Sequence, residues 1–72
     1  SGLHHVPFSL VMSVYKTEPD SRVAGKNLGE CGLRPATSAT VVAIQSAGGH
    51  LTVNPRSVDV INAGDSVMVL GR

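Results

Sequence analysis

Three histidines, one cysteine and five acidic residues are the side chains of this 72-residue sequence that could do chemistry. His4 and His5 are adjacent and would point to opposite faces of an extended chain, so only the fold could join them to His50 in a metal site. Surface histidines are therefore the interpretation that this spacing favours. Cys31 has no histidine near it in the sequence, which favours a buried structural thiol over a nucleophile.

The acidic residues are scattered and fall mostly at expected turns. Asp20 and Asp65 fit turn residues better than a general acid and base. Gly25-Lys26 lacks the glycine spacing of a phosphate-binding loop, and no serine occupies a strand–elbow–helix arrangement. The sequence therefore predicts that this is not an enzyme, with no catalytic residue and no metal ligand.

Composition and charge limit the partners further. The net charge is +1, and the basic residues form no stripe, so no nucleic-acid partner is expected. No apolar run is long enough to span or insert into a membrane, and no signal peptide is visible. A single cysteine fits a reducing, cytoplasmic compartment. The start at Ser1-Gly2, without a methionine, suggests a fragment of a longer protein.

Hydrophobic periodicity predicts a small α+β domain. Residues 8–16 alternate as a strand, with Phe8, Leu10, Met12 and Val14 on one face. A short helix of about two turns is expected over residues 24–32, ended by Gly32. Further strands are expected at residues 39–46, 50–54 and 66–71, and residues 57–61 are expected to form a short strand or a tight turn. The order β-α-β-β-β indicates a mostly antiparallel sheet with one short helix, in a single domain over residues 1–72 with residues 1–7 as a frayed lead-in.

Two of these strands, residues 39–46 and 66–71, are apolar on both faces. One face can meet the core of the domain, and a homodimer is the simplest cover for the other. The polar stretch between the last strands is expected to be structural: Asn62-Ala63-Gly64-Asp65 is a turn in which glycine supplies a positive φ and Asp65 bonds to nearby backbone.

The order of several short motifs resembles the TrkA-C domain, the C-terminal subdomain of the RCK (regulator of potassium conductance) module. The resemblance covers roughly residues 9–71. Each motif is weak alone, and the set in this order is specific. The pieces are Gly25-Lys26-Asn27-Leu28, Val42-Ala43-Ile44, a glycine-containing hairpin, Asn54-Pro55, and Ala63-Gly64-Asp65 before an apolar strand.

The resemblance implies regulation rather than catalysis. Such domains dimerise and act on the cytosolic side of a potassium channel, a potassium uptake system or a cation transporter, which would be a membrane-embedded partner. A ligand in the dimer cleft shifts the gate in some members. The alternative is a purely structural dimerisation module of a transporter, with no ligand of its own.

Cyclic di-AMP or another nucleotide is the effector that the resemblance suggests. In members that resemble the cyclic di-AMP binders, the cleft is lined by an arginine after the helix, the loop beyond it and a proline after the hairpin. The corresponding residues here are Arg34, Ala36, Thr40 and Pro55. Binders more often have a basic and aromatic loop where this chain has residues 35–37.

Overall fold

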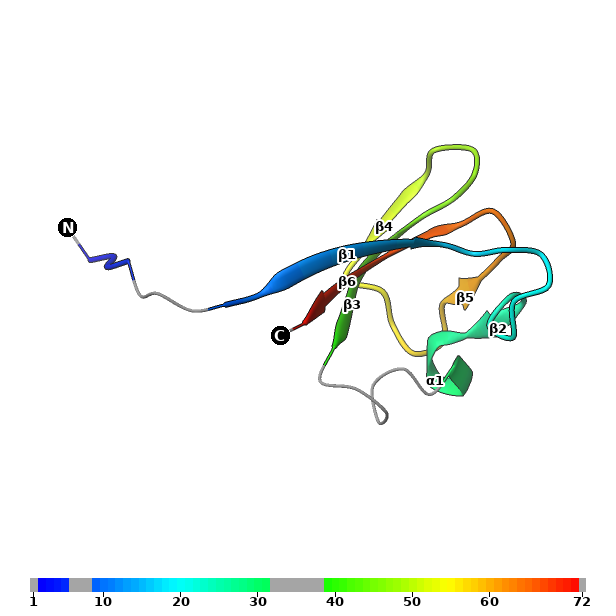
Figure 1. The fold of residues 1–72 in the computed structure, drawn as a ribbon, viewed down its shortest axis with the longest axis horizontal. Helices are drawn as coiled ribbons and strands as arrows, with labels where there is room; N and C mark the ends of the chain where they lie inside the picture. The colour runs from blue at the N-terminus through cyan, green and yellow to red at the C-terminus, as the bar shows by residue number, and fades with distance from the viewer. Residues whose placement is uncertain (1, 6–8, 32–38, 72) are drawn as a thin grey trace.

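The computed structural model describes residues 2–5, 9–31 and 39–71. Its main element is a four-stranded sheet in the order β1-β6-β3-β4, in which every neighbouring pair is antiparallel. Figure 1 shows β6, the last strand, lying between β1 and β3. The strands are β1 (Val11–Lys16), β3 (Thr40–Gln45), β4 (Leu51–Val53) and β6 (Ser66–Gly71).

A second, smaller layer covers one face of this sheet. It consists of a two-stranded sheet, β2 (Lys26–Asn27) with β5 (Val60–Ile61), and the single turn of α1 (Leu28–Cys31), seen to one side of the large sheet in Figure 1. We call the covered side of the large sheet the inner face and the opposite side the outer face. The core between the layers contains Val41, Ile44, Ile61 and Val67, with Val23, Leu28, Cys31 and Val69 packed against it.

The predicted fold class is confirmed, and the expected helix is shorter than the sequence suggested. Gly25 has a φ of +83°, which a right-handed helix cannot contain, and Lys26–Asn27 pairs with β5 instead. The helix begins only after Asn27, whose Oδ1 accepts a hydrogen bond from the Glu30 N–H at 2.9 Å. Glu30 Oε1 in turn accepts from the Asn27 N–H at 3.1 Å, which is a reciprocal capping box.

Both predicted turns are present. Ser46 and His50 close the β3–β4 hairpin, with Gly49 at a φ of +94°. In the second turn, the Asp65 N–H donates to the Asn62 carbonyl at 3.0 Å, and Asp65 Oδ2 accepts from the Asn62 N–H at 2.9 Å. Gly64 has a φ of +87°, so this stretch is the structural turn that precedes β6.

The outer face of the large sheet is apolar, and no element among the described residues covers it. Cross-strand pairing places Val14, Met68, Ala43 and Val53 in one row. Val14 is 61% exposed and Val53 is 69% exposed, whereas Ala43 is buried. Apolar side chains therefore line both faces of the sheet, as the sequence indicated for its strands. In the described part of the chain, no helix has the length and apolar composition of a membrane span.

Candidate functional site

The four residues expected to bind a ligand are only partly placed. Arg34 and Ala36 lie outside the described residues. Thr40 is the exposed first residue of β3, and Pro55 is buried just after β4. The Asn54 N–H donates to the Val42 carbonyl at 2.8 Å, so the end of β4 lies beside the start of β3. Thr40 and Pro55 thus belong to the same end of the β3–β4 pair, and their role in binding stays a prediction.

Asn54 explains how the chain leaves β4. Its φ is +53°, the left-handed region that asparagine tolerates better than most other residues. The chain turns there and continues to β5. The left-handed backbone conformation at Asn54 therefore accounts for asparagine at this position without any ligand.

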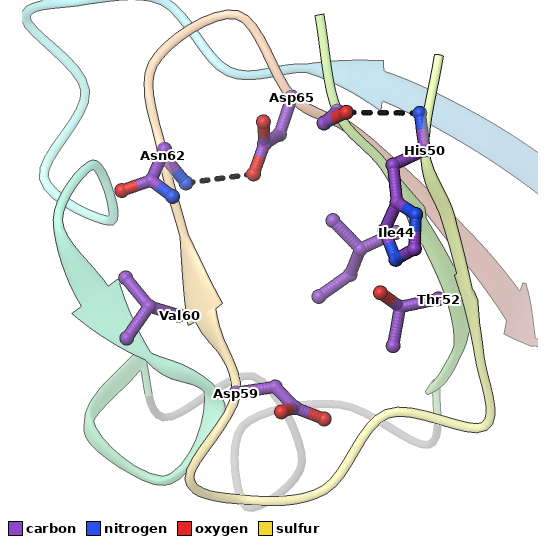
Figure 2. Close-up of a pocket in the computed structure, with 8 residues that line it drawn as sticks. Ile44, His50, Thr52, Asp59, Val60, Asn62 and Asp65 are labelled. Carbon is purple, nitrogen blue, oxygen red and sulfur yellow. Dashed lines mark hydrogen bonds between the residues drawn. The ribbon is translucent and has the colours of Figure 1, made fainter. Parts of the chain in front are cut away.

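A first cleft lies between the β3–β4 hairpin and β5 and has a volume of about 210 Å³ (Figure 2). Ile44 lines it from the core, and most of the other side chains are polar. Asp65 is 6% exposed and holds the Asn62 N–H, while Asp59 Oδ2 accepts from the Arg56 N–H at 2.7 Å. Its lining residues are Ile44, Ser46, His50, Thr52, Asp59, Val60, Asn62 and Asp65.

Both carboxylates in the first cleft therefore have structural partners. Asp59 also lies 3.9 Å from the Arg56 guanidinium, in a pair whose arginine side chain is 79% exposed, so the pair adds little stability. Each carboxylate closes a turn by accepting a backbone N–H three residues earlier. Both carboxylates of the first cleft therefore have a structural role, which agrees with the prediction that Asp65 is a turn residue.

A second cleft, of about 240 Å³, lies along β1 on the inner face of the sheet. Tyr15 and Val11 are 61% and 58% exposed, although β1 pairs with β6 along its whole length. The cleft reaches the residue that precedes β3. Its described lining residues are Val11, Ser13, Tyr15, Ala39, Val69 and Gly71.

The second cleft contains a feature that the sequence analysis missed. Residues 35–37 contain no aromatic side chain, but the topology brings Tyr15 from β1 into one cleft with Ala39, which follows them closely in the sequence. Alternation along β1 already places Tyr15 and Ser13 on the same face. The strand order that sets this face beside Ala39 is not visible in local sequence.

The surroundings of the histidines and of Cys31 bear on the metal-site and nucleophile alternatives. Across residues 2–5, 9–31 and 39–71, no group of three or more His, Cys, Asp or Glu side chains could hold a metal ion. The Cys31 thiol is half-buried and donates to the Asn27 carbonyl at 3.1 Å. Burial raises the pKa of this thiol, Lys26 lowers it and Glu30 raises it, with a net rise. This environment disfavours the thiolate, as expected for a structural thiol.

Comparisons with known proteins agree with the motif pattern. The family model of the TrkA-C domain matches residues 12–72. None of the curated proteins compared matches the chain. The RCK_C domain dimer of S. agalactiae BusR in complex with c-di-AMP is 33% identical, with a TM-score of 0.74. That match covers 85% of this chain and 79% of the BusR chain.

Two further neighbours come from longer proteins. S. agalactiae BusR in complex with its busAB-promoter DNA is 30% identical, with a TM-score of 0.76, and the match covers 97% of this chain and 34% of that one. The GsuK channel bound to NAD is 26% identical, with a TM-score of 0.69, and the match covers 83% of this chain and 11% of that one. This sequence thus spans about a third of the DNA-bound BusR chain.

The expectation that the protein has no nucleic-acid partner is wrong. Proteins with this domain include BusR in complex with its promoter DNA. The expectation came from the net charge of +1 and the missing basic stripe, which describe these 72 residues alone. Two thirds of the DNA-bound BusR chain lie outside the match, so the charge of one domain could not exclude DNA as a partner of the whole protein.

Proposed function

The chain belongs to the TrkA-C domain family, and from this premise we propose that it is a cytosolic regulatory domain that binds cyclic di-AMP as a dimer. The observation that carries the proposal is the similarity to the BusR RCK_C domain dimer in complex with c-di-AMP. That match includes most of both chains, at 33% identity. The shared region is therefore the domain that the BusR complex contains, not a distant part of a larger protein.

Exposed apolar surface supports the dimer. Val14 and Val53 on the outer face, and Val11 and Tyr15 on the inner face, are each more than half exposed. Soluble monomers seldom leave large contiguous apolar patches open to water. A second copy would cover part of this surface and enlarge a core in which, among the larger described side chains, only Ile61 is fully buried.

The proposed mechanism is a population shift. An effector that binds one dimer geometry more tightly than another changes their ratio, and it can supply only the difference between the two binding free energies. Moving a two-state equilibrium from 1:99 to 99:1 needs about a 10⁴-fold difference in affinity, roughly 5.5 kcal/mol. An effector that contacts both copies of the domain would bind the two dimer geometries with different affinities, because those contacts exist only in one relative position of the copies.

Two output modules have support. Transport of potassium or another cation is what the family resemblance implies, and the GsuK channel is a structural neighbour. Control of transcription is the second candidate, favoured by the BusR complexes with promoter DNA at 30% and 31% identity. Fluorescence anisotropy of the full-length protein on its own upstream DNA, with and without cyclic di-AMP, distinguishes them. Effector-dependent binding supports the second output and its absence supports the first.

Isothermal titration with cyclic di-AMP tests the sensing step, combined with sedimentation to determine the oligomeric state. The expected result is one ligand per dimer, with AMP as a control that lacks the second base. A ligand at a hundredfold its dissociation constant should also stabilise the folded protein by about 2.7 kcal/mol. A confirmed dimer that binds no nucleotide would contradict the proposal and favour a purely structural dimerisation module.

A further inference from the structure

Tyr15 exposes an aromatic ring in the second cleft. It is the only tyrosine of the chain, and its side chain is 61% exposed although it lies on the inner face, opposite Val67 of β6. Val11, two residues earlier on the same face, is 58% exposed. A tyrosine combines a large apolar ring with a hydroxyl that can donate or accept a hydrogen bond. Such a ring beside an open apolar wall is suited to stack on another planar ring.

The remaining side chains of the second cleft have complementary chemistry. Val69 and Ala39 are apolar, Gly71 adds no side chain, and Ser13 supplies a hydroxyl beside Tyr15. No described lining residue carries a charge. The cleft therefore offers stacking and neutral hydrogen bonds, which suit a heterocycle with ring nitrogens and do not suit a phosphate or a free ion.

The size of the cleft also limits its ligand. Its volume of about 240 Å³ lies below the roughly 300–1,000 Å³ of pockets that enclose a drug-sized molecule. One ring system fits, and a whole dinucleotide does not. The rest of a dinucleotide would have to extend beyond the cleft on the inner face, because cross-strand pairing with Leu70 and Met12 places Thr40 on the outer face.

We infer that the second cleft is the subsite for one purine base of the nucleotide effector, with Tyr15 as its stacking platform. This inference rests on the proposed function, because it assigns a part of that ligand to a part of this chain. Base–aromatic stacking does not depend on a charged partner, so Tyr15 compensates for the missing aromatic residue at positions 35–37. The Ser13 hydroxyl provides a hydrogen-bonding group for a ring nitrogen.

Titration calorimetry with cyclic di-AMP on the wild-type chain, Tyr15→Leu, Tyr15→Phe and Val58→Ala tests the subsite. Val58 is the control, because it is equally exposed at 61% and lines neither cleft. Tyr15→Leu should weaken binding by about 5- to 150-fold, the range of base–aromatic stacking, whereas Tyr15→Phe and Val58→Ala should stay near wild-type affinity. Thermal melts of all four proteins establish that the variants fold.

A second readout is specific to the ring itself. The chain has one tyrosine and no tryptophan, so tyrosine emission reports Tyr15 alone. Emission should change on saturation with cyclic di-AMP, after correction for adenine absorbance with a parallel titration of N-acetyltyrosinamide.

The outcomes separate the subsite from the proposed function. Wild-type binding with an unaltered Tyr15→Leu affinity, or with unaltered emission, would overturn the subsite and leave the proposed function standing. Equal losses in Tyr15→Leu and Val58→Ala would show that the effect is not specific to the second cleft and would also overturn it. No binding by the wild-type chain would overturn both.

Discussion

Replacement of Ile61 by valine probes the centre of the core. Ile61 lies on β5, is 0% exposed, and joins the small layer to Val41, Ile44 and Val67 of the large sheet. The change removes one methylene group, whose burial is worth about 0.8 kcal/mol, and leaves a small cavity. Together these effects should cost about 0.5–1.5 kcal/mol of unfolding free energy.

That loss is large for a domain of this size. A chain of 72 residues is expected to have about 4–11 kcal/mol of unfolding free energy in total. For a domain of this length each kcal/mol corresponds to about 4–8 °C in Tm, so Ile61→Val should lower Tm by about 2–12 °C. Circular dichroism melts measure this shift, at one fixed protein concentration because the Tm of the proposed dimer would depend on concentration.

Val58→Ala is the control for this experiment. Val58 lies in the turn before β5 and is 61% exposed, so its truncation should change the unfolding free energy by no more than about 0.5 kcal/mol. If Ile61→Val lowered Tm no more than Val58→Ala does, Ile61 would not be the buried contact between the two layers, and the packing described for the core would be refuted.

Three other changes test the turn, the ligand site and the thiol. Gly64→Ala should destabilise the fold by about 1–2 kcal/mol in urea denaturation. The reason is that its φ is +87° and an added Cβ would lie 3.3 Å from that of Ala47, whereas Gly48→Ala, with no atom nearer than 3.9 Å, should be nearly neutral. Arg34→Ala should weaken cyclic di-AMP binding by about 10- to 150-fold in calorimetry with an unchanged Tm, through loss of hydrogen bonds to phosphate; unchanged affinity would exclude that role. Because burial raises the pKa of the Cys31 thiol, iodoacetamide should alkylate the folded chain more slowly at pH 8 than the chain in urea. The two rates should converge as the pH rises above that pKa, and equal rates at pH 8 would contradict the burial.

Local sequence was sufficient to predict an element where a single short segment determines that element. The alternation around Val14 predicted β1, and the apolar runs predicted β3 and β6 nearly to their observed ends. The turn at Gly64-Asp65 was predictable because its positive φ and its side-chain bond are made within four residues. The motif order added the family, which no single segment specifies.

The helix is where local reasoning was least accurate. Residues 24–32 look weakly helical by composition, but the Gly25 N–H donates to the Ile61 carbonyl at 2.7 Å, and the Leu28 N–H donates to the Asp59 carbonyl at 3.0 Å. Those acceptors lie more than 30 residues away in the chain, as their residue numbers show. Backbone N–H groups that donate to distant carbonyls cannot also form helix hydrogen bonds. The helix propensities of residues 24–32 could not reveal these long-range acceptors.

The sequence by itself determined the strands, the tight turns, the family and the surplus of apolar strand residues, because each depends on neighbouring residues or on their order. Only the tertiary structure decided which of those residues meet. It buried Ile61 from a two-residue strand, left Val14 and Val53 exposed on the outer face, and brought Tyr15 and Ala39 into one cleft. The physical reason is strand order: with β6 between β1 and β3, segments from opposite ends of the chain become neighbours, and side-chain alternation along each strand then determines the face on which they meet.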